Sequence, residues 1–301
     1  MKNPLVSIIM PAYNASAHIL ETLESIRKQT YTNWEIILVN DCSTDDTLNL
    51  VSQFSAQVSN VIKIITNESN SGVSVSRNVA VANANGTWLA LLDSDDVWLP
   101  NHLETLINEV VKDSEINIVY SGCLVFLDEV NNIIFKQEIT PDLLNNFNIS
   151  LYTHQIGINP CTVLLDKNSW NMVGGMVKNL NHAEEKEMFI GLAKRGAKFK
   201  FSAQHTALYR KYSNTSAASN NNSKMALGSI YVFEKYFDWE AVPLKIRIQE
   251  LSDAYLSYAR LNRLNDIQAS VQYSFKAFKI KKSVMNISYF IAFKFLSLIQ
   301  K

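Results

Sequence analysis

Four short runs of apolar residues recur through the first hundred positions of the chain, at residues 5–10, 34–39, 61–65 and 88–92. They are rich in β-branched residues, and polar or helix-spaced segments separate them. The first separating segment carries Ile19, Leu23 and Ile26 at helical spacing. The runs are apolar almost throughout, which is typical of strands buried on both faces. The pattern therefore predicts a parallel sheet covered by helices.

The chain beyond residue 100 shows a mixed pattern of helices and strands. We expect one helix at 103–110 and a second helical pattern that ends near Gly196. We expect strands at 118–127, 133–136, 162–165, 198–201 and 206–210. Residues 213–223 are rich in Ser, Asn and Ala and predict a loop. Helical segments follow at 225–237, 244–264 and 267–299. We therefore expect a domain of residues 1–216, with halves at about 1–100 and 101–216, and a helical region of residues 217–301.

Charge and composition exclude several classes of protein. Lys and Arg number 28 and so do Asp and Glu, so the net charge gives no reason to expect a nucleic-acid partner. Cys42, Cys123 and Cys161 lack the spacing of a zinc site or disulfide framework and favour a cytoplasmic location. Phosphate-loop, dinucleotide-binding, zinc-protease and serine-hydrolase motifs are absent from the sequence. We expect neither a signal peptide nor a membrane span.

Polar residues follow three of the predicted strands, at 11–14, 40–43 and 93–96. Because ligands bind outside the carboxyl ends of the strands in open α/β sheets, these turns should converge on one crevice. Asp93, Asp95 and Asp96 would then share a small volume, where a divalent cation that bridges carboxylate and phosphate oxygens relieves their repulsion. The structural alternative is that Asp93 and Asp96 cap the following helix.

These motifs resemble those of the family 2 glycosyltransferases, which have the GT-A fold. The matching segments agree in order, spacing and position at strand ends, and they are residues 6–14, 37–45, 70–78 and 91–96. The similarity continues more faintly through 173–176, 184–196 and 208–210, and covers roughly residues 5–216. It implies a GT-A nucleotide-diphospho-sugar transferase fold, with a mixed sheet flanked by helices, for residues 1–216. The helical region would be a C-terminal extension.

The resemblance also implies a binding site for a UDP-sugar donor. Pro11, Ala12 and Tyr13 would line the pocket for uracil and ribose, and Asp41 would hydrogen-bond the uracil. The full set of implied nucleotide-sugar-binding residues is Pro11, Ala12, Tyr13, Asn14, Asp41, Arg77, Asp93 and Ser94.

A metal ion, Mn²⁺ or Mg²⁺, is implied next to this pocket. Asp95 would be its principal ligand, and Asp93 would contact the ribose or the metal. Arg77 either contacts the nucleotide-sugar or forms a structural ion pair, and Asp96 braces the loop. Many members of the family carry a His shortly after the segment that matches 208–210. This chain has Tyr212 there, so we do not carry that ligand over.

Glycosyl transfer also needs a base that takes the proton of the acceptor hydroxyl, and a desolvated carboxylate suits this role. The family places it in a Glu-Asp pair that opens a helix. The matching pair here is Glu184 and Glu185, so Glu stands where Asp is usual, and Lys186 replaces a usual aromatic residue. The base is therefore Glu185 or Glu184. The alternative is that both belong to a solvated acidic first turn favoured by the helix dipole.

By resemblance, the chain would transfer a hexose or N-acetylhexosamine, with inversion, from a UDP-sugar to a hydroxyl of a glycan or lipid-diphosphate-linked saccharide. The setting would be bacterial surface polysaccharide or lipooligosaccharide biosynthesis. One alternative is a non-catalytic sugar-nucleotide-binding or partner-binding module that retains the fold. A nucleotidyltransferase would usually carry a Gly-rich basic loop after the first strand, and residues 11–14 do not form one.

The C-terminal segment is basic. Residues 241–301 carry ten Lys and Arg against three Asp and Glu, and residues 267–301 carry six Lys and no acidic residue among many aromatic and aliphatic ones. Such a segment can lie peripherally on an anionic membrane, here the inner face of the cytoplasmic membrane. The equally weighted alternative is a helix pair that packs on the catalytic domain with its lysines in solvent. Binding of nucleic acid is disfavoured by the acidic first 240 residues.

Overall fold

The computed structural model describes residues 3–180, 183–213 and 222–299. The chain divides into two compact units, and each is described by itself. The first consists of Met1–Leu144, Gly157–Asn179 and Gly191–Asn214, and the second of Asn145–Ile156, Leu180–Ile190 and Thr215–Lys301. The domain boundary predicted at residues 216 and 217 lies outside the described residues and stays a prediction.

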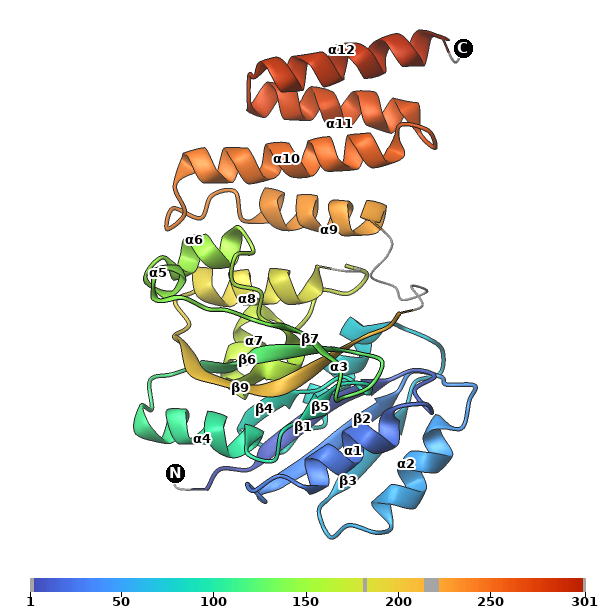
Figure 1. Cartoon of the computed structure of the whole chain (residues 1–301), viewed down its shortest axis with the longest axis vertical. Coiled ribbons are helices and arrows are strands. Elements are labelled where there is room, and N and C mark those ends of the chain that lie inside the picture. The colour runs from blue at the N-terminus through green and yellow to red at the C-terminus, as the bar shows by residue number, and fades with distance from the viewer. Residues whose placement is uncertain (1–2, 181–182, 214–221, 300–301) are drawn as a thin grey trace. The chain divides into compact units, whose positions relative to one another are not determined.

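The first unit begins with alternating strands and helices (Figure 1). The strands are β1 (Val6–Ala12), β2 (Trp34–Asn40), β3 (Ile62–Thr66) and β4 (Trp88–Leu91), and the helices are α1 (Ile19–Arg27), α2 (Thr47–Ser55) and α3 (Val73–Ala82). The four strands pair in parallel, with Val6 of β1 opposite Trp34 of β2 and Trp88 of β4. The parallel sheet predicted from the four apolar runs is confirmed, with strand ends within two residues.

The later strands of the first unit turn the sheet into a mixed one, in the order β3-β2-β1-β4-β8-β6-β9-β5, with β7 paired to β6. Strand β8 runs antiparallel to β4, and β6 runs parallel to β9. The strands are β5 (Val97–Trp98), β6 (Ile118–Leu127), β7 (Ile133–Lys136), β8 (Val163–Asp166) and β9 (Phe199–Lys211). The helices are α4 (His102–Lys112), α5 (Pro141–Asn145), the 3-10 turn η1 (Pro160–Thr162) and α7 (Lys167–Val173).

Burial on both faces explains why β1 and β2 of the parallel sheet are mostly apolar. All seven residues of β1 and all seven of β2 are buried. Alternate residues of β1, such as Ile8 and Met10, share one core with Leu23 of α1 and Leu106 of α4. Helix α3 packs against β1 and β2, and Ile9 is as fully buried as its neighbours. The buried polar side chains inside these two strands pair with each other, since Ser7 Oγ of β1 donates to Glu35 Oε1 of β2 at 2.6 Å, and the polar turns begin where the strands end.

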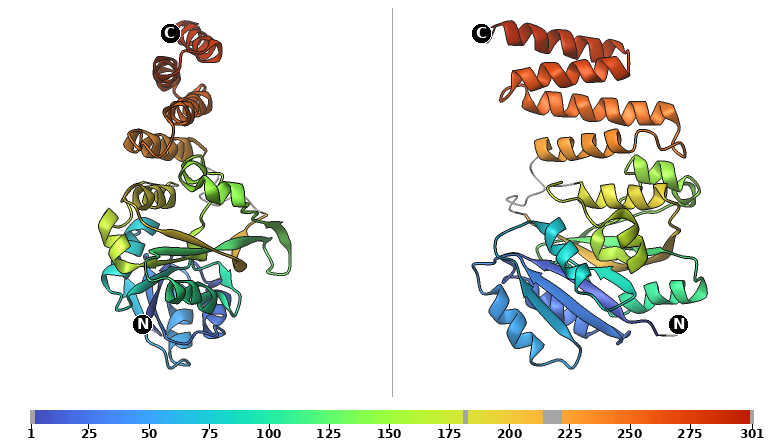
Figure 2. Two further views of the ribbon diagram at one scale, coloured as in Figure 1. Left: turned by 90° about the vertical axis from the view of Figure 1, so that its left-hand side faces the viewer. Right: turned by 180° about the vertical axis from the view of Figure 1, so that it is seen from behind.

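The second unit is helical. Its elements are α6 (Phe147–Tyr152), the first part of α8 (Glu184–Lys194), α9 (Asn222–Lys235), α10 (Leu244–Asn262), α11 (Ile267–Ile280) and α12 (Val284–Ile299). Helices α9 to α12 lie side by side in chain order, each packed against the next (Figures 1 and 2). Among the described residues, no helix combines the length and the apolar character needed to cross a bilayer.

Two expectations about the elements were wrong. We expected two strands at 198–201 and 206–210, but one strand, β9 (Phe199–Lys211), runs through both segments. Its pairing with β6 continues across two register shifts, which the local sequence does not reveal. Residues 267–299 form two helices, because Ser283 begins a new one: its Oγ accepts the backbone N–H of Asn286 at 3.2 Å, in the manner of an N-cap.

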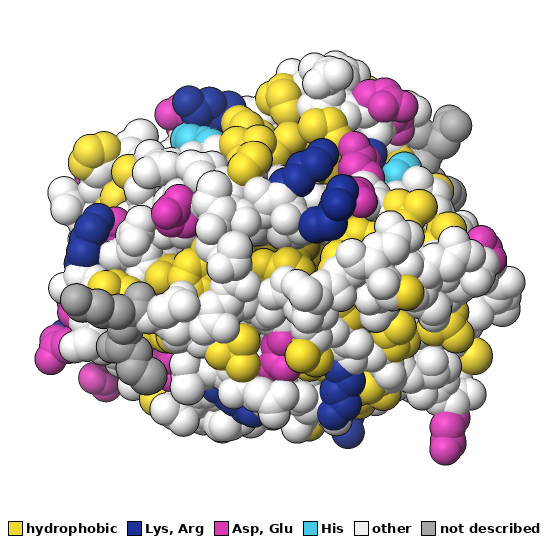
Figure 3. All heavy atoms as spheres, turned by 90° about the horizontal axis from the view of Figure 1, so that it is seen from below, with side chains coloured by type: hydrophobic (Ala, Val, Ile, Leu, Met, Phe, Trp, Pro, Cys, Tyr) yellow, Lys and Arg dark blue, Asp and Glu magenta, His cyan; other side chains and the backbone are white. Residues whose placement is uncertain are grey.

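The surface carries both charge signs. Figure 3 shows one face of the molecule, seen from below, on which Lys and Arg side chains are interspersed with Asp and Glu and with neutral side chains. Lys112 on α4, for example, pairs with Glu109 at 2.8 Å.

Buried His102 predicts a pH dependence of stability. Its Nδ1 lies 2.8 Å from Thr206 Oγ1, its ring stacks on Trp98, and burial lowers its pKa from 6.5 to about 3. Below pH 6.5 the unfolded chain therefore binds a proton that the folded chain does not. The free energy of unfolding consequently decreases as the pH is lowered. Between pH 7 and pH 5 we expect the wild type to lose about 2 kcal/mol more than His102→Phe, measured by urea unfolding. Equal losses in both proteins would contradict this assignment.

Candidate functional site

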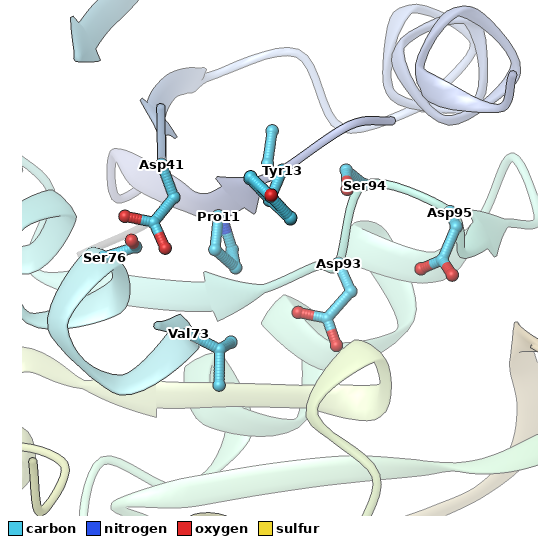
Figure 4. Close-up of a pocket in the computed structure, with 9 residues that line it drawn as sticks. Pro11, Tyr13, Asp41, Val73, Ser76, Asp93, Ser94 and Asp95 are labelled. Carbon is cyan, nitrogen blue, oxygen red and sulfur yellow. The ribbon is translucent and has the colours of Figure 1, made fainter. Parts of the chain in front are cut away.

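The three polar turns come together around one cavity of about 190 Å³ in the first unit (Figure 4). The carboxyl ends of β1, β2 and β4 supply most of its walls, and the first turn of α3 closes one side. In Figure 4, Asp41 lies at one end beside Ser76, and Asp93 and Asp95 lie toward the other end. The lining residues are Pro11, Ala12, Tyr13, Asp41, Val73, Ser76, Asp93, Ser94 and Asp95.

Asp41 holds the loop that precedes α3. Its Oδ1 accepts hydrogen bonds from Asn67 Nδ2 at 2.7 Å and from the backbone N–H of Ser71 at 2.9 Å, and its Oδ2 accepts one from Gly72 N–H at 2.8 Å. Gly72 has φ +84°, a conformation that favours glycine. An ionised carboxylate offers about four acceptor positions, so these three bonds leave Asp41 room for one more donor.

Asp93 is held by an arginine that stands behind the cavity wall. The Nη2 of Arg77, on α3, donates to Asp93 Oδ1 at 2.7 Å. The Arg77 side chain is only 1% exposed, whereas that of Asp93 is 30% exposed. Of the two roles expected for Arg77, the structural ion pair is formed. Arg77 is not one of the residues that line the cavity.

A second arginine holds the same turn from β9. The backbone N–H of Arg210 donates to Asp96 Oδ1 at 2.9 Å, and its Nε donates to the carbonyl of Asp95 at 2.8 Å. Its other nitrogens reach the carbonyl of Asp128 and the carboxylate of Glu21. Asp96 is buried, and burial together with the nearby Asp95 carboxylate raises its pKa well above its usual value. Asp96 therefore lies inside the turn as part of its framework.

Asp95 has the features of a cation ligand. Its Oδ2 accepts a hydrogen bond from Tyr212 Oη at 2.7 Å. Burial raises the pKa of Asp95 and the neighbouring Asp93 carboxylate adds to the rise, while the hydrogen bond from Tyr212 and the charge of Arg210 oppose it. Within the described ranges, no three His, Cys, Asp or Glu side chains form a complete metal cage. One or two carboxylates completed by phosphate oxygens is the usual arrangement for Mg²⁺, so this donor set fits such an ion.

Asn14 lies beside the cavity without lining it. It has φ +48°, its backbone N–H donates to Ser43 Oγ at 3.0 Å, and its Oδ1 accepts the N–H of Thr44 at 2.9 Å. It thus joins the turn after β1 to the turn after β2, and its predicted role in donor binding stays a prediction.

The candidate bases open α8, in the part of the chain that belongs to the second unit. Glu184 is buried, and its Oε2 accepts the backbone N–H of Ala183 at 3.0 Å; Glu185 is half-buried. The Nζ of Lys186 lies 4.1 Å from the ring centroid of Phe233, and burial lowers the pKa of Lys186 to about 8. Because Glu184 is buried, it is not part of a solvated acidic first turn. The choice of base between Glu184 and Glu185 stays open.

A comparison with known protein families gives this arrangement a context. The model of the family described as "Glycosyl transferase family 2" matches residues 7–214. The chain belongs to this family. The match includes every cavity residue and both candidate bases. As a glycosyltransferase of family 2, the chain can be compared with relatives whose reactions are named.

Several relatives of this family 2 glycosyltransferase are bacterial. It is 38% identical over 174 residues to the Escherichia coli UDP-Glc:alpha-D-GlcNAc-diphosphoundecaprenol beta-1,3-glucosyltransferase WfgD. The aligned residues cover 57% of this chain and 64% of WfgD. It is 29% identical to the putative teichuronic acid biosynthesis glycosyltransferase TuaG of Bacillus subtilis, over 77% of this chain and 88% of TuaG. The chain thus spans less than two thirds of the length of WfgD.

Solved structures confirm the GT-A fold. The structure of S. aureus TarS 1-349 in complex with UDP-GlcNAc matches 91% of this chain and 81% of that chain, with a TM-score of 0.68 and 20% identity. The mannosyltransferase PcManGT from Pyrobaculum calidifontis, in complex with GDP-Man and Mn²⁺, matches 99% of this chain and 88% of that chain, with a TM-score of 0.61 and 16% identity.

Sequence reasoning did not assign Arg210, Ser76 or Val73 to the site. The only signal for Arg210 was its place in the faint similarity at 208–210. Ser76 and Val73 lie within the matching segment 70–78, where the four-residue spacing from Arg77 could have placed Val73 on the same helix face as Arg77. Tyr212 was noted as a departure from the family pattern, and its bond to Asp95 appears only in the fold.

The clamp formed by Arg210 predicts that lysine cannot replace it. A single ammonium group cannot reach the Asp95 carbonyl, the Asp128 carbonyl and Glu21 as the guanidinium does. We expect Arg210→Lys to lower the free energy of unfolding by about 2 kcal/mol, measured by urea denaturation.

Arg27→Lys is the matched control, because Arg27 forms an exposed ion pair with Glu24 on α1. Its cost should stay below about 0.5 kcal/mol. Equal costs for the two substitutions would contradict the role given to Arg210.

Proposed function

We propose that this family 2 glycosyltransferase transfers a hexose or N-acetylhexosamine from a UDP-sugar to an acceptor hydroxyl, with inversion and with the help of a divalent cation. One observation carries the proposal. The cavity has a carboxylate with a spare acceptor position, Asp41, at one end, and the pair Asp93 and Asp95 toward the other. A nucleoside diphosphate has matching chemistry, with a base that can donate an N–H and an anionic diphosphate.

The choice of uracil rests on two kinds of support. The ring N–H of uracil can donate to the free acceptor position of Asp41, while the corresponding nitrogen of cytosine has no hydrogen to donate. Guanine also carries a ring N–H, so Asp41 alone does not separate UDP from GDP. The names of WfgD, with UDP-Glc, and of the TarS complex, with UDP-GlcNAc, favour a UDP-sugar.

Asp95, with Asp93, would hold Mn²⁺ or Mg²⁺, and Mn²⁺ accompanies GDP-Man in the PcManGT complex. A bound divalent ion supplies charge that offsets the negative charge developing on the departing diphosphate. The chain's own contribution is to orient the carboxylates. Arg77 donates to Asp93, Tyr212 donates to one oxygen of Asp95, and Arg210 donates to the carbonyl of Asp95 and the carboxylate of Asp96.

In the proposed reaction, the acceptor oxygen bonds to the anomeric carbon while the bond from that carbon to the diphosphate oxygen breaks. The leaving UDP takes the electron pair of the broken bond. Glu185, with Glu184 as the alternative, takes the hydroxyl proton as the oxygen attacks. A single in-line displacement inverts the anomeric centre.

We further propose that the acceptor is a lipid-diphosphate-linked saccharide of bacterial surface polysaccharide assembly, handled on the cytoplasmic side of the membrane. The acceptor in the name of WfgD and the pathway in the name of TuaG support this choice. All three cysteines are free thiols, as a reducing compartment favours.

A turnover assay tests the proposal. We expect UDP release from one of UDP-Glc, UDP-GlcNAc and UDP-Gal, and no GDP release from GDP-Man, only when Mn²⁺ and a short lipid-diphosphate GlcNAc acceptor are present. Chelation of the metal and Asp95→Ala should each abolish turnover. Glu185→Gln should lower kcat at least 100-fold with little change in the KM for the donor, because it removes proton transfer and not donor binding.

Glu184→Gln is the matched variant, since it changes the adjacent carboxylate in the same way, and we expect it to keep kcat within tenfold of wild type. The reverse result would assign the base to Glu184. Metal-dependent UDP binding without turnover on any acceptor would instead favour the non-catalytic module, and turnover that survives chelation would contradict the proposed metal.

A further inference from the structure

Helix α12 presents an apolar face that no other described element covers. The apolar side chains on one helical face are between 39% and 83% exposed, none of them is charged, and the exposed Ser288 lies among them. They are Val284, Ile287, Ile291, Phe295, Leu298 and Ile299. On an ordinary surface helix this face would be polar.

Contacts on the opposite side of α12 fix the orientation of the helix and so expose this face. Asn286, Phe293 and Ser297 are buried there. The Nδ2 of Asn286 donates to Ser252 Oγ of α10 at 2.9 Å and to the carbonyl of Ala277 of α11 at 3.0 Å. The polar contacts therefore point inward and the apolar side chains outward, the reverse of what solubility alone would select.

Among the described helices, α12 has a helical neighbour on one side. Helices α9, α10, α11 and α12 pack one on the next (Figure 2), so α10 and α11 have neighbours on both sides. The outer face of α12 has no such neighbour in the described part of the chain, and its apolar side chains stay in contact with solvent.

Lysines and aromatic rings border this face. The rings of Phe275 on α11 and Phe290 on α12 lie 5.0 Å apart between centroids. Lys279 Nζ lies 4.7 Å from the centroid of Phe275, and Lys294 Nζ lies 5.8 Å from that of Phe290. Residues 267–301 contain six Lys and no Asp or Glu; Lys276 pairs with Glu234 of α9 at 3.5 Å.

We propose that the outer face of α12 binds peripherally to an anionic lipid surface, with its apolar side chains in the interface and Lys279 and Lys294 at the headgroups. The combination of an apolar strip with lysines at its border is that of interfacial helices. Lysines near an anionic leaflet each add about 1 kcal/mol to such binding.

A second copy of the chain fits this face less well. Two α12 faces brought together would also bring together two sets of lysines with no acidic residue among residues 267–301 to pair with them. A strip about 10 Å wide and about 24 Å long covers only about 240 Å², whereas each partner usually buries roughly 800 Å² in a stable complex. Charge and size therefore both favour the lipid surface.

Flotation of the full-length chain with vesicles tests this proposal. We expect at least tenfold stronger binding to vesicles of phosphatidylcholine with 30% phosphatidylglycerol than to phosphatidylcholine alone, and weaker binding in 0.5 M NaCl. The variant Ile291→Ser/Phe295→Ser should lower binding at least tenfold, because it removes two side chains that are 59% and 63% exposed. Lys279→Gln/Lys294→Gln should lower binding only to the anionic vesicles.

The matched control is Ile134→Ser/Phe135→Ser on β7, which changes the same residue types at 51% and 55% exposure and should bind as wild type does. Far-UV circular dichroism and UDP binding verify that each variant is folded, and neither readout depends on lipid. Equal vesicle binding by the α12 variant and the wild type would overturn the proposal. So would a wild-type dimer in sedimentation equilibrium that Ile291→Ser/Phe295→Ser converts to a monomer, which would assign the face to self-association.

Discussion

The turn after β4 brings three carboxylates into one small volume, and the site depends on how their repulsion is offset. Asp93, Asp95 and Asp96 lie within four residues, and burial and mutual repulsion raise the pKa of both Asp95 and Asp96. Two arginines with buried side chains hold the turn from parts of the sequence that are more than a hundred residues apart. Arg77 pairs with Asp93, and Arg210 binds the backbone of Asp95 and the carboxylate of Asp96.

This constraint explains why the cavity needs more than the first hundred residues. The cavity walls come from β1, β2, α3 and β4, but the turn that carries Asp93 and Asp95 is completed by β9, more than a hundred residues later. Strand β9 pairs with β5 directly after the turn, with Val97 opposite Leu208. The sheet topology thus delivers Arg210 and Tyr212 to the carboxylates.

Much of the fold and of the cavity could be predicted because the signals are local. Each strand of the parallel sheet is one apolar run, and each polar turn follows its strand directly, so strand order alone brings Asp41 and Asp95 to one edge. The contacts of Arg210 and Tyr212 could not be predicted in this way. They depend on the pairing of β9 with β5, and β5 is only two residues long and leaves no pattern. The separation of α11 from α12 depends on one cap, Ser283, inside a segment with helical composition throughout.

The central claim is that the two ends of the cavity do different work, with Asp41 binding the base and Asp95 binding the metal and diphosphate. Calorimetric titration of UDP and of uridine, each with and without Mn²⁺, tests it most directly. The account predicts that Mn²⁺ tightens UDP binding at least tenfold and leaves uridine binding unchanged. It also predicts that Asp95→Ala removes only the effect of Mn²⁺ on UDP, while Asp41→Asn weakens both ligands. If Asp95→Ala left the Mn²⁺ effect intact, or if Asp41→Asn bound uridine as tightly as the wild type, the claim would be contradicted.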